Sequence, residues 1–270
     1  MKFIDIHAHV QFAAYDADRD EVVARAREAG VGMINVGTQQ DTSKTAVELA
    51  HAYPDIAWAT VALHPVHTSK SYHDKKEIGE GGEEFTSRGE VFDYDFYKKL
   101  GADPKVIGIG ECGLDYYRLT DETKAKQQET FIKHIELANE LKKPLMLHIR
   151  QAYEDALDIL QKHAKIRGDV HFFAGEWITA KKFLDLGFTL SFTGVITFTH
   201  DYNEVVKNTP LDMILAETDS PYITPEPLRG KRNEPANVKY VVQRIAELKN
   251  LPLEEVEKAV VANAKRVFNI

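Results

Sequence analysis

The sequence predicts an α/β fold in which eight parallel strands close into a (β/α)8 barrel of the TIM type. Short, wholly apolar runs alternate with amphipathic stretches along the chain, as in parallel sheets that are buried on both faces. A barrel closes such strands without leaving an edge, and 270 residues is a common length for one barrel domain. An open doubly wound sheet is the alternative, but no Gly-x-Gly-x-x-Gly follows the first apolar run.

The first half of the chain supplies four strands. The opening strand begins at Phe3 and ends at the histidines His7 and His9, and further strands are expected at residues 31–36, 56–63 and 105–110. Helices are expected at residues 19–30, 42–53 and 92–100. Residues 68–90 interrupt this alternation with charged side chains and glycines, which predicts a surface insertion after the third strand, inside a single domain of residues 1–270.

The second half continues the same alternation. Strands are expected at residues 144–148, 169–172, 188–192 and 211–216, and helices at residues 120–141, 153–163, 179–186 and 202–206. Two more helices, at residues 236–249 and 253–268, supply the eighth outer helix and one extra C-terminal helix.

Composition excludes several classes of protein. Hydrophobic and charged residues make up 43% and 28% of the chain, as in ordinary globular proteins. The net charge of −8 argues against a broad basic surface that coats nucleic acid, but it leaves open a local phosphate site, because bound cations invert the charge there. The single cysteine, Cys112, allows no intramolecular disulfide. With no membrane-length apolar run and no leader-like N-terminus, we expect a cytoplasmic protein.

Histidine and carboxylate side chains stand where the predicted strands end. In a barrel, all strand ends meet at one face, and chemistry takes place there. Each of these residues alone has an ordinary structural explanation, but independent structural roles give no reason for so many of them at one end of the barrel. The set is His7, His9, His64, Glu111, His148, His171 and Asp219.

Four histidines, one glutamate and one aspartate are too many ligands for one tetrahedral ion and suit two ions that share a carboxylate. Nitrogen-rich ligation favours Zn, Mn or Fe(II), while the carboxylates leave Mg open. Two such ions activate water and stabilise a leaving oxygen. The sequence therefore predicts metal-assisted hydrolysis.

Several motifs together resemble the TatD family of metal-dependent deoxyribonucleases, which belongs to the wider amidohydrolase-like hydrolases. The resemblance is colinear from end to end except at residues 68–90, and it implies a (β/α)8 barrel. The motifs are FIDIHAH at 3–9, GECGLDYY at 110–117, LHIR at 147–150, ETDSPY at 217–222, RGKRNEP at 229–235 and NAKRVF at 263–268.

The resemblance implies two metal positions that share Glu111. The first would use His7, His9, Glu111 and Asp219, and the second Glu111, His148 and His171. His64 would lie near the substrate phosphate, and Asp219 would also orient or deprotonate the attacking water. The family hydrolyses DNA phosphodiester bonds, commonly from the 3′ end of single strands, with Mg, Mn or Zn.

The sequence departs from the family's pattern in two places. His171 is followed by Phe-Phe-Ala-Gly, where the family usually has Cys-Phe-Ser-Gly, so that Ala174 lacks a hydroxyl. Residues 62–64, Ala-Leu-His, replace a glycine-containing approach to the His-Pro pair. The metal ligands are unaffected, whereas the substrate preference is placed in question, and an acidic insertion on this side would disfavour long polyanions.

Further residues are candidates for substrate contacts. Arg229 and Arg150 are expected to clamp phosphate with their guanidinium forks, the alternative being solvated loop residues. Tyr116 and Tyr117 would either stack a base or pack beside the barrel mouth. Glu217 is expected to hold a ligand histidine or a loop arginine.

Two alternatives to a DNA exonuclease remain open at this stage. The same site would also suit another small phosphoester, a lactone, an amide or an RNA-linked ester, since fold does not fix function. Many amide-cleaving relatives carry a carbamylated lysine at the end of the fourth strand, and Glu111 stands there instead, which favours phosphoester chemistry. The other alternative is a non-enzymatic metal-binding scaffold whose insertion contacts a protein partner.

Overall fold

The computed structural model describes residues 1–73, 85–118 and 120–270. Its main sheet has eight strands, and the neighbouring strands within it pair in parallel. In sheet order they are β1 (Phe3–Ala8), β2 (Val31–Val36), β3 (Ala57–Val61), β6 (Val106–Asp115), β7 (Leu145–Arg150), β8 (Gly168–Val170), β9 (Thr189–Phe192) and β10 (Ile214–Ala216).

The first and last strands meet and bring the barrel close to closure. Ala8 forms a parallel bridge with Ser220, and the amide of Asp219 donates to the carbonyl of His7 at 2.9 Å. Buried Asp5 strengthens this seam, because its carboxylate accepts from the amide of Thr218 at 2.9 Å. The predicted α/β barrel is therefore confirmed, and the open doubly wound sheet is excluded.

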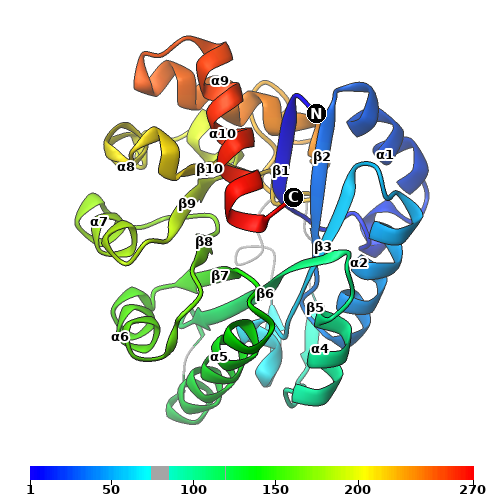
Figure 1. Cartoon of the computed structure of the whole chain (residues 1–270), viewed down its shortest axis with the longest axis vertical. Coiled ribbons are helices and arrows are strands. Elements are labelled where there is room, and N and C mark those ends of the chain that lie inside the picture. The colour runs from blue at the N-terminus through cyan, green and yellow to red at the C-terminus, as the bar shows by residue number, and fades with distance from the viewer. Residues whose placement is uncertain (74–84, 119) are drawn as a thin grey trace.

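Helices surround the strands on the outside (Figure 1). They are α1 (Arg19–Glu28), α2 (Gln40–Ala52), α4 (Tyr94–Gly101), α5 (Asp121–Leu141), α6 (Tyr153–His163), α7 (Trp177–Asp185), α8 (Asn203–Asn208) and α9 (Val238–Lys249). Their buried apolar faces pack on the strands and form the larger core. Among the described residues, no helix is both long and apolar enough to cross a membrane.

The extra C-terminal helix, α10 (Leu253–Phe268), packs beside β1 and β10 instead of joining the outer ring (Figure 1). Its Phe268 is 1% exposed and lies in a separate apolar cluster with Ile4, Ile34 and Ile107. Since Ile4 and Ile107 lie near the beginnings of their strands, α10 covers the N-terminal end of the barrel. The C-terminal end remains for polar chemistry.

Two predicted strand boundaries were wrong at functional positions. Residues 105–110 were expected to form the fourth strand, but β6 runs on through Glu111 to Asp115, which pairs with Arg150 of β7. His171 was expected on the sixth strand, but β8 ends at Val170, and the amide of His171 still donates to the carbonyl of Leu147. Strand pairing with β7, which an apolar pattern does not reveal, decides both boundaries.

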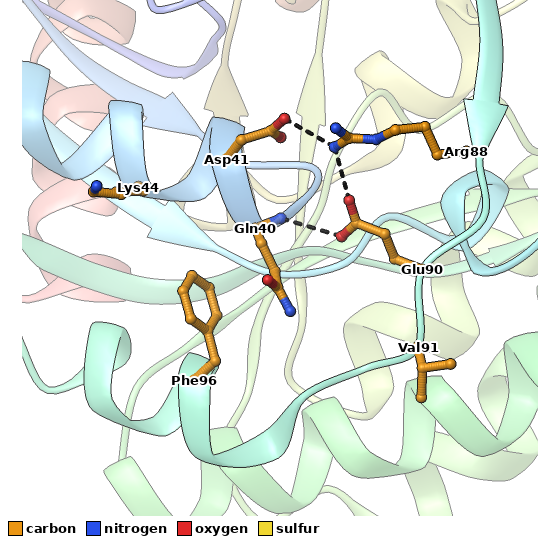
Figure 2. Close-up of a pocket in the computed structure, with 7 residues that line it drawn as sticks. All are labelled: Gln40, Asp41, Lys44, Arg88, Glu90, Val91 and Phe96. Carbon is orange, nitrogen blue, oxygen red and sulfur yellow. Dashed lines mark hydrogen bonds and ion pairs between the residues drawn. The ribbon is translucent and has the colours of Figure 1, made fainter.

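The expected insertion contains two short strands that pair antiparallel, β4 (Lys70–His73) and β5 (Phe85–Arg88). Residues 74–84, which lie between them in the sequence, are outside the described residues. Glu90, just after β5, accepts hydrogen bonds from the amide of Gln40 at 3.3 Å and from Arg88 at 2.9 Å. Figure 2 shows these contacts in a surface hollow of about 480 Å³ between α2 and α4. The hollow is lined by Gln40, Asp41, Lys44, Arg88, Glu90, Val91 and Phe96, and none of the candidate site residues is among them.

Candidate metal centre

Two β-bulges aim His7 and Glu111 into the barrel. On β1, the register runs from Asp5 opposite Met33 to Ala8 opposite Asn35, so three steps on β1 match two on β2. On β6, the register shifts in the same way between Ile109 and Cys112. An extra residue reverses the alternation of side chains, and bulges are common beside active sites for this reason.

Glu111 lies at the centre of four imidazoles. Glu111 is 4% exposed, and its Oε2 lies 3.3 Å from Nε2 of His7. Its Oε1 lies 2.8 Å from Nδ1 of His148, 3.2 Å from Nε2 of His64 and 3.3 Å from Nε2 of His171. The structure therefore brings together side chains from β1, β6 and β7 and from the residues that follow β3 and β8.

The β1 side of the cluster contains His7, His9 and Asp219. The Nε2 atoms of the two histidines lie 3.2 Å apart, and Asp219 Oδ1 lies 3.5 Å from the one in His9 and 3.8 Å from the one in His7. The other nitrogen of His9 is 2.8 Å from the carbonyl of Val36. All three predicted residues of this side thus face one another.

The β7 and β8 side contains His148 and His171, and each is backed by a carboxylate. Nε2 of His148 lies 2.9 Å from Asp115, and Nδ1 of His171 lies 3.1 Å from Glu217. Fully buried Glu217 also accepts from the amide of Phe172 at 2.7 Å. Of the two partners expected for Glu217, the structure shows the histidine, His171, and a carboxylate in this position fixes the tautomer and orientation of the ring.

The hydrogen bonds of His64 indicate its tautomer. Its Nδ1 accepts a hydrogen bond from the amide of Val66 at 3.2 Å, so in the neutral ring the proton sits on Nε2. That Nε2 faces Glu111 and therefore acts as a donor. A protonated nitrogen is no metal ligand, which favours a hydrogen-bonding role for His64 over direct coordination.

The buried carboxylates and imidazoles of this cluster shift one another's pKa values. Burial favours the neutral acid, but the surrounding imidazoles, with His64 the largest, hold the pKa of Glu111 well below its usual range. Burial works against the charged ring of His148 too, yet Asp115 and Glu111 raise its pKa to about 9. The pKa of His7 is lowered, chiefly by burial. Perturbed groups of this kind gather at functional sites.

The donor set fits divalent metal ions. Ring nitrogens and carboxylate oxygens lie within 4.8 Å of one another in three overlapping groups, which are His7–His9–Glu111, His7–His171–Glu217 and His64–Glu111–His148. Imidazole and carboxylate are the usual ligands of Zn and Mn. Glu111 belongs to two of these groups and is placed to touch both sides of the cluster.

The two arginines predicted as phosphate clamps stack on aromatic rings. The guanidinium of Arg150 lies 3.9 Å from the ring centre of Tyr117, and that of Arg229 lies 3.8 Å from the ring centre of Phe198. Tyr116, by contrast, is tied down by its hydroxyl, which donates to Asp155 at 2.9 Å. Of the two tyrosines considered for base stacking, Tyr117 is the exposed one.

Asp5 and Asp115 were missed as site residues by reasoning from the sequence. A signal for Asp5 existed, since it is a charged residue inside an otherwise apolar strand. Asp115 stands four residues after Glu111, and only the bulge and the length of β6 bring it to His148. Cys112 is buried, as a small filling residue would be.

A parallel barrel with imidazoles and carboxylates gathered at the C-terminal ends of its strands defines a metal-dependent hydrolase. The particular family follows from comparison with known proteins. Residues 4–269 match the family of TatD-related DNases, and the chain belongs to this family.

Relatives of known sequence agree with this assignment. The metal-dependent hydrolase YabD of Bacillus subtilis is 38% identical over 271 residues, covering 98% of each chain. The 3′-5′ ssDNA/RNA exonuclease TatD of Erwinia tasmaniensis is 32% identical over 276 residues, covering 98% of this chain and 99% of that one. Among solved structures, the TatD homologue YjjV of Escherichia coli K12 superposes with a TM-score of 0.82 at 26% identity, covering 100% of this chain and 98% of that one.

Proposed function

We propose that this hydrolase removes nucleotides from the 3′ end of single-stranded DNA with two divalent metal ions. The observation that carries the proposal is the position of Glu111, whose carboxylate stands among four imidazoles from four different strand ends. A relative that is 32% identical bears the name of a 3′-5′ ssDNA/RNA exonuclease, which supports both the substrate and the polarity.

The ligands divide into two sets in this proposal. His7, His9 and Asp219 would hold the first ion together with Glu111, and His148 and His171 would hold the second with the same carboxylate. Mg, Mn or Zn would serve, because the donors are a mixture of nitrogen and oxygen. Such a pair of ions supplies an activated water nucleophile and compensates the charge of the phosphate.

The chain's own residues complete the reaction. Asp219 is the carboxylate nearest His9 and orients the attacking water or accepts its proton. The Nε2–H of His64 donates a hydrogen bond to a phosphate oxygen, because its Nδ1 is already engaged by Val66. Glu111 is fully occupied by the imidazoles around it and serves as the shared ligand.

The test uses one oligonucleotide labelled at either end. Metal-depleted protein is supplied with Mg, Mn or Zn and given single-stranded DNA, the same strand in a blunt duplex, and RNA of the same sequence. We expect early loss of a 3′ label and a descending ladder from a 5′ label, with little cleavage of the duplex. His148→Ala is the control for a contaminating nuclease. Absence of cleavage with every metal would contradict the proposal.

A further inference from the structure

Two exposed aromatic rings at the mouth of the barrel each carry an arginine on one face. Tyr117 and Phe198 are 40% and 39% exposed, although a guanidinium lies 3.9 Å and 3.8 Å from their respective ring centres. One face of each ring is thus covered by a guanidinium, while the residue as a whole stays partly exposed to solvent. Burial in the core does not explain such rings, because much of their apolar surface stays in water.

The first pair, Tyr117 with Arg150, is joined directly to the metal centre. The amide of Tyr117 donates to Oδ1 of Asp115 at 2.9 Å, and Oδ2 of the same carboxylate lies 2.9 Å from His148. Arg150 follows His148 by two residues on β7, and its carbonyl accepts from the amide of Tyr116 at 2.9 Å. The pair is therefore held at a fixed position beside His148.

The second pair, Phe198 with Arg229, lies on the loops that follow β9 and β10. The side chain of Arg229 donates to the carbonyl of Thr224 at 3.0 Å, which fixes the guanidinium over the ring. The loop that follows β10 carries both Asp219 and Arg229, and the ring centre of its Tyr222 lies 6.3 Å from that of His9. The loop that carries Arg229 thus passes the His9 side of the centre.

We propose that the Tyr117–Arg150 and Phe198–Arg229 pairs are two nucleobase-stacking subsites on either side of the metal centre. The proposal rests on the function proposed above and names how its substrate is held. An unpaired base stacks on the open face of the ring, while the guanidinium on the other face supplies positive charge for the adjoining phosphate. Bases in a duplex are stacked on each other and cannot enter, so the two subsites also select single strands.

The two arginines therefore act through a flat stacked surface and not as the simple phosphate forks expected from the sequence. A guanidinium that already covers a ring is restrained in orientation. Replacement of the ring thus removes both the base contact and the support of the arginine. Stacking contributes about 1–3 kcal/mol per base, which corresponds to a loss of roughly 5- to 150-fold in kcat/KM for each ring.

The experiment combines protein variants with abasic substrates. Single-stranded oligonucleotides that carry one abasic residue at successive positions from the 3′ end are cleaved by the metal-loaded wild type and by Tyr117→Ala and Phe198→Ala. Each alanine variant should lose activity on the intact strand, and this loss should shrink at one abasic position that differs between the two variants. Tyr117→Phe and Phe198→Tyr should restore most of the activity. Ile178→Ala, at an exposed apolar residue of α7, is the matched control.

A binding titration keeps this inference separate from the proposed function. The metal-free proteins are titrated against a fluorescent single strand by anisotropy, and the alanine variants should bind roughly 5- to 150-fold more weakly than wild type. If wild type cleaves no DNA but this difference is found, the subsites stand and the exonuclease proposal fails. If wild type cleaves and binds, but both alanine variants match it, or their losses are equal at every abasic position, the subsites are disproved.

Discussion

The two sides of the metal centre differ in what stands behind their histidines. On the β7 and β8 side, the far nitrogens of His148 and His171 each face a buried carboxylate. On the β1 side, the far nitrogen of His9 faces only the carbonyl of Val36, and the buried Nδ1 of His7 has no hydrogen-bond partner among the described residues. One side is thus supported by charge, and the other by neutral groups or none.

The histidines of two neighbouring metal positions are thus supported unequally. A carboxylate behind an imidazole makes the ring a stronger donor and fixes which nitrogen carries the proton. Glu217 is itself held, because Ser191 Oγ lies 2.9 Å from it and 2.6 Å from Asp169, whose pKa burial raises to about 8. We therefore expect the ion between His148 and His171 to bind more tightly than its neighbour, for which Asp219 is the proposed carboxylate ligand.

The largest effect should come from the residue that both sides share. Glu111→Gln keeps the shape of the side chain but removes the charge that faces four imidazoles. Both ions lose a ligand, so we expect hydrolysis to fall by about 10³-fold or more, since such ions supply several kcal/mol. The number of metal ions bound per protein, measured by mass spectrometry, should fall because both positions lose affinity. Glu129→Gln, in an exposed ion pair with Lys133, is the control, and one ion retained at wild-type affinity would refute a shared ligand.

The next largest effect should be confined to the β7 and β8 side. In Asp115→Asn, the amide oxygen keeps the hydrogen bond from the amide of Tyr117, so the NH2 group faces Nε2 of His148. Because that NH2 group donates to Nε2, the ring proton of His148 moves to Nδ1, the nitrogen that faces Glu111. Glu217→Gln removes charge behind His171 in the same way. Each variant should weaken one ion by about 10- to 100-fold.

Calorimetric titration with Zn or Mn separates the two sites and tests this expectation. Asp185→Asn, in an exposed pair with Lys181, serves as the matched control. Carboxylate support would not distinguish the two sides if either variant weakened both ions equally. The same conclusion would follow if the loss were confined to the ion on the β1 side.

The contrast between the two sides also marks what could be predicted from the sequence. The gathering of the candidate ligands was predictable, because each stands near the end of an apolar run, and their residue types point to metal. The groups behind the histidines were harder to predict. Asp115 reaches His148 only through the bulge in β6, and the group behind His9 is the backbone carbonyl of Val36, which the residue type does not reveal. Long-range register decides such contacts. A single domain of residues 1–270, the role of the insertion and a cytoplasmic location stay predictions.

A smaller effect should appear in the pH dependence of the metal-free protein. The pKa of His148 is raised from 6.5 to about 9, so its charged form stabilises the fold fully below pH 6.5 and this contribution is lost as the pH rises through 9. The pKa of His171 is also raised, so its charged form stabilises the fold in the same way. His7 and His64 have lowered pKa values, so they affect the pH dependence of stability only below pH 6.5.

We expect the free energy of unfolding of the metal-free protein to fall by about 2 kcal/mol between pH 6.5 and 9, or roughly 5 °C in Tm. With metal bound, the proton is already displaced, so the trend should vanish or reverse as metal affinity rises with pH. Thermal melts of both forms, with His148→Gln beside them, measure this. A metal-free protein whose Tm rises over this range would contradict the charge assigned to His148.

The smallest effect should come from the neutral support on the β1 side. The carbonyl of Val36 accepts from Nδ1 of His9 at 2.8 Å and from Nε2 of Gln11 at 2.7 Å. Gln11→Leu leaves this carbonyl to His9 alone, and a neutral hydrogen bond contributes only about 1 kcal/mol, so the affinity of the first ion should change by no more than about fivefold. Titration of Gln11→Leu beside Asp115→Asn compares the two sides directly. If Gln11→Leu weakened its ion as strongly as Asp115→Asn weakens the other, a neutral carbonyl would support a ligand histidine as well as a carboxylate does, and the two sides would be equivalent.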